Sequence, residues 1–261
     1  DSRLRKSYFQ AGGNGVVMRI APHALNDNPD LGPINRQVMI NGILTHGHPR
    51  ALLGALLYAC AIRQAALTTE TLRFGGLVDF LIEKRQDWAI LPKWENKYNE
   101  WVVAANDVFP DGYDRAWEET VNEVLQGLDI IKNALSKGAM AVDRAVLTEL
   151  GCFDKKVNGA GTVSALVAIY LASRYAADPI IGLREAAFAE GADTDTNASM
   201  FGALIGALHG TEWIKSHWFT VQDAGYLKQL AKDISSKATL SANGLAWNKK
   251  ATDRLINLLN R

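Results

Sequence analysis

The residues best suited to chemistry in this sequence stand between Gly191 and Ala198, in the run Gly-Ala-Asp-Thr-Asp-Thr-Asn-Ala. Asp193, Asp195 and Thr196 place two carboxylates and a hydroxyl close together in the chain. In an extended loop alternate side chains share a face, so we expect the two carboxylates to converge, with Thr196 where the next helix begins. Hard oxygen ligands in this arrangement suit a hard cation such as Mg²⁺.

Two other interpretations of this run compete with a metal site. Asp and Thr are common helix caps, because their oxygens accept hydrogen bonds from unpaired N–H groups at a helix start. One such residue explains one cap, whereas three together favour a cation or a cationic partner. A calcium EF-hand would use Asp193, Asp195 and Asn197 as its first ligands. It fails further on, because Ala198 replaces the required glycine and Leu204 the required Glu. The pattern alone leaves a metal site and a capping loop open.

A second candidate is the glycine-rich loop from Gly12 to Gly15, in which Asn-Gly is typical of a tight turn. Alternatively, its bare backbone N–H groups would let a diphosphate approach closely. Arg19 follows and could pair with a carboxylate or lie on the surface.

A third candidate is Thr45-His46-Gly47-His48. A His-x-His pair can bind zinc, but no third ligand is near it in the sequence, and a hydrogen bond from His46 to a polar ligand is favoured. The chain has no Gly-x-Ser-x-Gly, Walker or His-Glu-x-x-His motif, so those reaction types have no local support.

Helical periodicity recurs almost throughout the chain. Between Val163 and Leu171, for example, apolar residues follow the spacing of an amphipathic helix. The expected helices cover residues 34–44, 50–67, 69–86, 118–131, 139–150, 163–171, 180–189, 197–208, 221–236 and 252–260. With no sustained strand alternation and no repeat, the sequence predicts an all-α fold, a compact helical bundle in a single domain. Gly202 and Gly206 lie inside an expected helix, where each glycine costs about 1 kcal/mol of helix stability relative to Ala. We expect close approach of a neighbouring helix to compensate for this cost.

Composition narrows the class of protein. The chain has 261 residues, 48% of them hydrophobic and 21% charged, as in ordinary globular proteins. Lys plus Arg equal Asp plus Glu at 28 each, which gives no general pull toward nucleic acid or an anionic membrane. Two distant cysteines, Cys60 and Cys152, indicate no disulfide framework and favour the cytoplasm. No apolar run is expected to approach the roughly 20 residues of a membrane helix.

Three loops together resemble one family, the ADP-ribosylglycohydrolases, which include dinitrogenase-reductase-activating glycohydrolases and ADP-ribosyl hydrolases. The similarity rests on Gly13-Asn14-Gly15-Val16-Val17-Met18-Arg19-Ile20-Ala21-Pro22, on Thr45-His46 and on the Asp-Thr run from 191 to 198. A weaker match extends over residues 159–170. The motifs occur in family order and span most of the chain.

The resemblance implies an all-α fold with two Mg²⁺ ions in the complete family site. It assigns Asp193, Asp195 and Thr196 to the metal and the backbone loop around Asn14 to ADP-ribose. The residues implied in substrate binding are Gly13, Asn14, Gly15, Met18, His46, Gly159 and Gly161. Ala160 stands where an aromatic residue is usual, which removes a stacking partner.

One departure from the family pattern concerns the other metal ligands and the base. Family members carry an N-terminal Thr-Asp-Asp-Thr segment and an upstream acidic residue, and no Asp-Asp pair exists in this sequence. Residues 1–261 are therefore expected to form the C-terminal portion of the family domain, with one Mg²⁺ or none. A companion chain and a degenerate member are the alternatives to a fragment.

The function expected from this resemblance is Mg²⁺-dependent hydrolysis of the glycosidic bond between ADP-ribose and a protein side chain or small molecule. The alternative is a non-catalytic ADP-ribose-binding or structural pseudoenzyme that has lost half of the metal site. A different Mg²⁺-dependent nucleotide hydrolase is a second enzyme alternative. The expected partner is an ADP-ribosylated protein or a small ADP-ribose conjugate, with no membrane and no nucleic acid.

Overall fold

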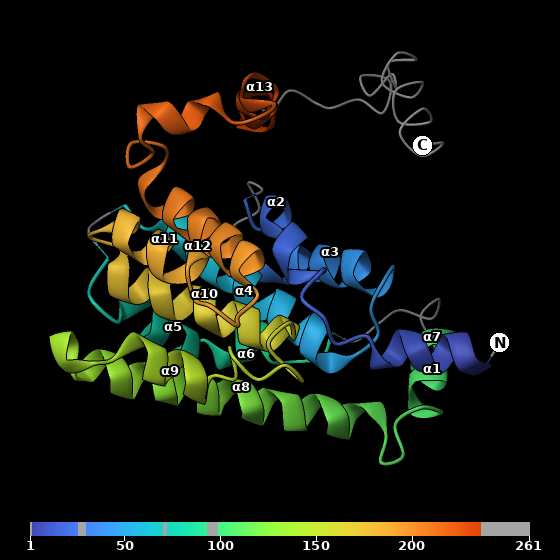
Figure 1. Cartoon of the computed structure of the whole chain (residues 1–261). Coiled ribbons are helices and arrows are strands. Elements are labelled where there is room, and N and C mark those ends of the chain that lie inside the picture. The colour runs from blue at the N-terminus through green and yellow to red at the C-terminus, as the bar shows by residue number, and fades with distance from the viewer. Residues whose placement is uncertain (1, 26–29, 70–71, 93–98, 236–261) are drawn as a thin grey trace. The chain divides into compact units, whose positions relative to one another are not determined.

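A computed structural model describes residues 2–25, 30–69, 72–92 and 99–235, arranged as two compact units, 1–213 and 214–261 (Figure 1). The helices of the first unit are α1 (Ser2–Gln10), α2 (Ala21–Ala24), α3 (Leu31–Ile43), α4 (Pro49–Leu67), α5 (Gly76–Glu83), α6 (Arg85–Trp88), α7 (Asn99–Asn106), α8 (Tyr113–Ser136), α9 (Asp143–Glu149), α10 (Gly161–Tyr175), α11 (Pro179–Ala187) and α12 (Thr194–His209). The described part of this unit also contains the 3₁₀ helices η1 (Val17–Arg19) and η3 (Gly138–Met140). The described ranges contain no strand, and the predicted all-α fold is confirmed. The extent of one domain over residues 1–261 stays a prediction.

The core of the first unit is built around α4 and α10, which pack against each other. Every residue of α10 from Gly161 to Ser173 is buried. A helix that is apolar on nearly all sides must be covered by neighbours, and α3, α5, α8, α11 and α12 cover this pair between them (Figure 1). The expectation that no apolar run approaches membrane-spanning length is wrong for α4, which meets that length and composition. Most of α4 is nevertheless buried within the unit, as a core helix is.

Close helix approach occurs at glycines other than the two that the sequence suggested. A Cβ atom built on Gly54 of α4 would stand 2.5 Å from the carbonyl carbon of Gly161. At Gly202 and Gly206 of α12, by contrast, a Cβ would meet no described atom within 4 Å. The expectation of close approach there is therefore wrong, because these two glycines lie on a half-exposed side of α12.

These two glycines supply a stability prediction. Gly202→Ala is expected to raise the free energy of unfolding by about 0.5–1 kcal/mol, because Ala loses less conformational entropy in a helix interior and the new methyl has room. Thermal or urea denaturation of the full chain would measure this change. A marked loss of stability in the variant would show that another surface covers this side of α12.

Several predicted helix boundaries need correction. The helix expected over residues 69–86 is absent from 72 to 75, and α5 begins only at Gly76. Gly75 has φ of 76°, a left-handed conformation that interrupts a helix and that glycine adopts readily. The helix expected over 139–150 divides into η3 and α9, and that over 118–131 extends to all of α8. The helix predicted over 252–260 lies outside the described residues.

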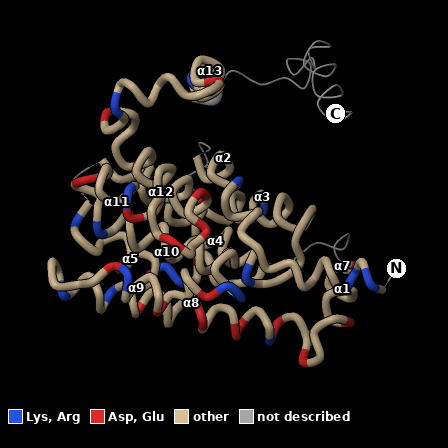
Figure 2. Tube along the Cα trace, viewed as in Figure 1, with Lys and Arg blue, Asp and Glu red and all other residues tan. Residues whose placement is uncertain are grey.

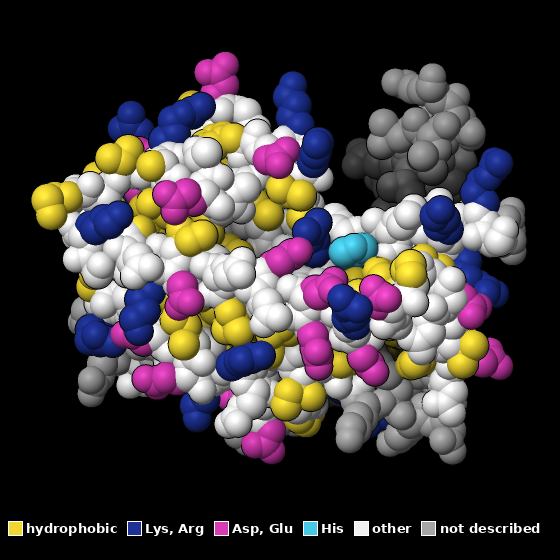
Figure 3. All heavy atoms as spheres, turned by 90° about the horizontal axis from the view of Figure 1, so that it is seen from below, with side chains coloured by type: hydrophobic (Ala, Val, Ile, Leu, Met, Phe, Trp, Pro, Cys, Tyr) yellow, Lys and Arg dark blue, Asp and Glu magenta, His cyan; other side chains and the backbone are white. Residues whose placement is uncertain are grey.

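α8 separates an apolar side from a charged side. Its buried residues include Trp117, Val121, Val124, Leu128 and Ile131, at helical spacing. Most of the charged residues of α8 are acidic (Figure 2). The face seen in Figure 3 carries both signs of charge interspersed with apolar side chains. Such a mixed face is typical of a solvated surface.

The second unit is described over residues 214–235. It contains η4 (Ser216–Thr220) and α13 (Ala224–Ser235), so the helix expected over 221–236 begins three residues later. Lys228 of α13 places its Nζ 3.7 Å from the centre of the Phe219 ring, a cation–π contact that ties the two helices together.

Candidate functional site

The glycine-rich loop at residues 12–15 is joined to the loop at 159–161 by backbone hydrogen bonds. The Asn14 N–H donates to the Gly159 carbonyl at 2.9 Å, and the Gly161 N–H donates to the Gly12 carbonyl at 3.0 Å. Gly13 and Ala160 form an isolated antiparallel bridge between them. Two of the predicted binding segments, far apart in the sequence, therefore lie side by side.

The Asn14 side chain links this pair of loops to the Asp-Thr run. Its Nδ2 donates to Asp193 Oδ2 at 2.7 Å and to Ser164 Oγ at 2.9 Å. A Cβ on Gly159 would stand 3.8 Å from Asp193 Oδ2. Ser164 is fully buried in α10, and the sequence analysis missed it because an isolated Ser in an apolar helix carries no motif.

The Asp-Thr run adopts a different local structure from the extended loop that was expected. Asp193 is the N-cap of α12, with no capping hydrogen bond from its side chain, and the helix starts at Thr194. Thr196 therefore lies inside the first turn, where it is buried, and not at the helix start. The predicted convergence of the two carboxylates stays a prediction. The neighbouring Asp193 side chain lowers the pKa of Asp195, and the backbone N–H groups of Thr196 and Asp195 lower it further.

His46 occupies the space beside the glycine loop. A Cβ on Gly15 would stand 3.3 Å from His46 Cε1, and one on Gly13 would stand 3.8 Å from its Nε2. Burial lowers the pKa of His46, and the nearby positive charge of Arg19 lowers it further. The ring is therefore neutral at physiological pH. One of its nitrogens carries a proton and donates a hydrogen bond, and the other accepts one.

The structure thus brings the three sequence motifs to one place. The sequence model of the ADP-ribosylglycohydrolases matches residues 2–243. The chain belongs to the ADP-ribosylglycohydrolase family. Membership supports an all-α hydrolase that acts on glycosidic bonds of ADP-ribose. A search of curated proteins found no match.

The other residues that the family resemblance singled out differ in their surroundings. Met18 lies on η1 and is 47% exposed, with its N–H bonded to the Asn14 carbonyl at 3.0 Å. Among the glycines of the predicted site, Gly161 has the least room for a side chain, since a Cβ there would stand 2.7 Å from the Arg50 carbonyl oxygen. Ala160 is nearly buried, so it offers no platform for stacking.

His48 has a structural role at the start of α4. Its Nδ1 accepts a hydrogen bond from the Arg50 N–H at 3.1 Å and caps α4. Burial and the charge of Arg50 lower the pKa of His48 to about 4, partly opposed by Glu123. The two histidines belong to no cluster of three or more His, Cys, Asp or Glu side chains fit for a metal, and the described ranges contain no such cluster.

The donor types at the start of α12 suit Mg²⁺, although the described residues contain no group of three or more His, Cys, Asp or Glu side chains placed to hold a metal ion. Asp193 and Asp195 contribute carboxylate oxygens and Thr196 a hydroxyl, the hard donors that Mg²⁺ prefers. Because Mg²⁺ retains several water ligands, three protein donors match a single hydrated ion better than a pair of ions. Asn14 already occupies one side of Asp193 Oδ2, which leaves the remaining carboxylate lone pairs for a cation.

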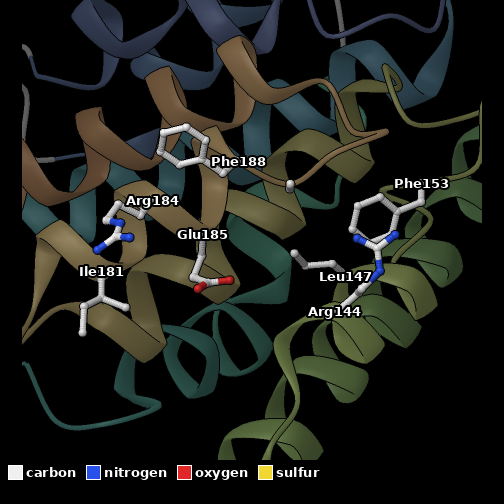
Figure 4. Close-up of a pocket in the computed structure, with 8 residues that line it drawn as sticks. Arg144, Leu147, Phe153, Ile181, Arg184, Glu185 and Phe188 are labelled. Carbon is white, nitrogen blue, oxygen red and sulfur yellow. The ribbon is translucent and has the colours of Figure 1, made fainter.

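An open pocket of about 510 Å³ lies beside this site, between α9 and α11 (Figure 4). Arg144 stacks on Phe153 with 4.5 Å between the guanidinium carbon and the ring centre. Phe153 also approaches Gly191, at 3.8 Å from a Cβ built there. None of the predicted site residues lines this pocket, whose walls are Arg144, Leu147, Phe153, Ile181, Arg184, Glu185, Phe188 and Ala189. It is therefore a neighbour of the Asp-Thr run and not part of the motif cluster.

Proposed function

We propose that this ADP-ribosylglycohydrolase cleaves the glycosidic bond between ADP-ribose and a modified protein side chain or a small molecule, with Mg²⁺ as cofactor. The observation that supports the proposal is the direct contact of the glycine loop with the Asp-Thr run, through Asn14 and Asp193. An amide that holds a carboxylate in place is the kind of outer contact that orients a metal ligand.

The chain's own residues divide into two groups in this proposal. The backbone around Gly13, Gly15 and Gly159 lets the diphosphate approach closely, because these residues carry no side chain of their own. His46, beside the same loop, donates a hydrogen bond to the ligand. We assign no general base among these residues.

The second group forms the metal side of the proposed site. Asp193, Asp195 and Thr196 would hold Mg²⁺, and Asn14 fixes the orientation of Asp193. A bound Mg²⁺ ion supplies charge stabilisation and a template for oxygen groups of the substrate and water.

The proposal predicts release of free ADP-ribose from ADP-ribosylated protein when Mg²⁺ is present, and its loss when EDTA removes the metal. Chromatography of the reaction mixture measures the product. A panel of other nucleotides, run in parallel, separates this activity from that of a different Mg²⁺-dependent hydrolase. Calorimetric binding of ADP-ribose without any release would instead support the non-catalytic binding module.

A further inference from the structure

Arg19 is held in one orientation by four hydrogen bonds to the glycine loop, to α3 and to the loop that follows α3. Its Nη1 donates to the Gly15 carbonyl at 2.9 Å, and its Nε donates to Asn41 Oδ1 at 2.8 Å. Its Nη2 donates to the Asn41 carbonyl at 3.0 Å and to Thr45 Oγ1 at 2.7 Å. A planar guanidinium with this many partners is a rigid cation, although much of the side chain is exposed. None of these four acceptors is a carboxylate, so the ion pair that the sequence suggested for Arg19 is not among the contacts that orient it.

The hydroxyl of Thr45 lies between Arg19 and His46. Its oxygen accepts the hydrogen bond from Arg19 and lies 2.8 Å from His46 Nδ1. A hydroxyl has one donor and two acceptor sites. The cation attracts the oxygen lone pairs, so the hydroxyl hydrogen points away from Arg19. If that hydrogen is directed at Nδ1, Thr45 donates to His46, whereas a proton on Nδ1 would make His46 the donor to the second lone pair of the hydroxyl.

The tautomer of His46 follows from this direction. A neutral imidazole that accepts at Nδ1 carries its proton on Nε2. That nitrogen lies over the bare glycine backbone, 3.6 Å from a Cβ built on Gly15 and 3.8 Å from one built on Gly13. The lowered pKa of His46 agrees with a neutral ring at this position.

We propose that Arg19 is a positioning residue that acts through Thr45 to fix His46 as an Nε2–H donor toward an oxygen of the bound ligand. The ligand half of this inference rests on the proposed function, whereas the tautomer half does not. The two halves are therefore measured separately.

The tautomer is measured by long-range ¹⁵N NMR spectra of the histidine side chains in the full, ligand-free chain above neutral pH. His46→Gln assigns the signal. Wild type and Thr45→Ser, which keeps the hydroxyl, are expected to show a protonated Nε2 and an unprotonated Nδ1. In Thr45→Val and Arg19→Gln the two nitrogen shifts are expected to move toward each other, as in a mixture of tautomers. Asn41→Ala, which removes one partner of Arg19 but not Thr45, is the matched control and is expected to resemble wild type.

A proton on Nδ1 in wild type would overturn the inference. So would a Thr45→Val spectrum equal to that of wild type, because the hydroxyl would then have no influence on the ring. Since Thr45 is exposed, the variant is expected to fold, and its melting temperature checks this.

The ligand half is tested with ADP-ribose itself as the probe. Its Kd is expected to rise about tenfold in Thr45→Val and in Arg19→Gln, to be restored in Thr45→Ser, and to rise no further in the double variant. An altered tautomer with an unchanged Kd would remove the ligand half. If wild type binds no ADP-ribose, the proposed function fails, and the spectra still decide the tautomer.

Discussion

Asp193→Asn is expected to reduce the release of ADP-ribose by about 100-fold or more, because this carboxylate serves two partners at once. Its Oδ2 accepts the hydrogen bond from Asn14 Nδ2 at 2.7 Å, and together with Asp195 it would form the proposed metal side. The new amide can offer its oxygen to Asn14 only by turning its NH₂ group away from Asn14. That NH₂ group has no lone pair for a cation, so the variant keeps the loop contact and loses the ligand.

The matched control for this substitution is Glu190→Gln, which removes an exposed carboxylate from the segment just before the Asp-Thr run. It is expected to leave the activity near the wild-type value. Titration of Mg²⁺ in both variants separates loss of metal affinity from loss of turnover. Full activity of Asp193→Asn at every Mg²⁺ concentration would exclude Asp193 as a metal ligand, and equal losses in both variants would point to a general effect of charge.

Gly54→Ala is expected to destabilise the first unit by about 1–3 kcal/mol, through overpacking at the contact between α4 and α10. The new methyl would stand 2.5 Å from the Gly161 carbonyl carbon and 2.6 Å from its oxygen. Both obstacles are backbone atoms, which have no rotamer by which to move aside. The strain is transmitted to the 159–161 loop, so we also expect weaker binding of ADP-ribose. Urea denaturation measures the first effect and calorimetry the second.

Gly202→Ala is the matched comparison for this prediction, since it adds the same methyl to another helix with open space around it. The two variants are expected to shift stability in opposite directions. A Gly54→Ala protein as stable as wild type, with unchanged ADP-ribose affinity, would show that α4 and α10 can separate slightly without disturbing the site.

Local sequence predicted the helices well where the apolar pattern was continuous, and less well where glycine intervened. Periodicity over 50–67 matched α4 almost residue for residue. The helix expected over 69–86 did not, because Gly75 can adopt the left-handed conformation that interrupts a helix and periodicity alone does not register it. Apolar spacing reports which side of a segment is buried, and carries little information on where backbone geometry changes.

The site was predictable as a set of motifs but not as a network. The sequence pointed to Asn14, His46 and Asp193, and the structure places the loops that carry them together. It could not show that Asn14 holds Asp193, nor that Thr45 lies between Arg19 and His46. Such contacts join residues up to 179 positions apart, and no local pattern records which loops will meet.

The sequence by itself determined the helical class and the residue types available for chemistry, because helix periodicity and side-chain chemistry are local properties. Tertiary packing alone decided which glycines must stay small. Gly54 meets the backbone of Gly161, whereas Gly202, in an equally small-residue stretch, meets open space. Tertiary packing also decided the arrangement of the polar groups in the site. The loop before α4, the start of α10 and the start of α12 are brought together only when the core helices pack.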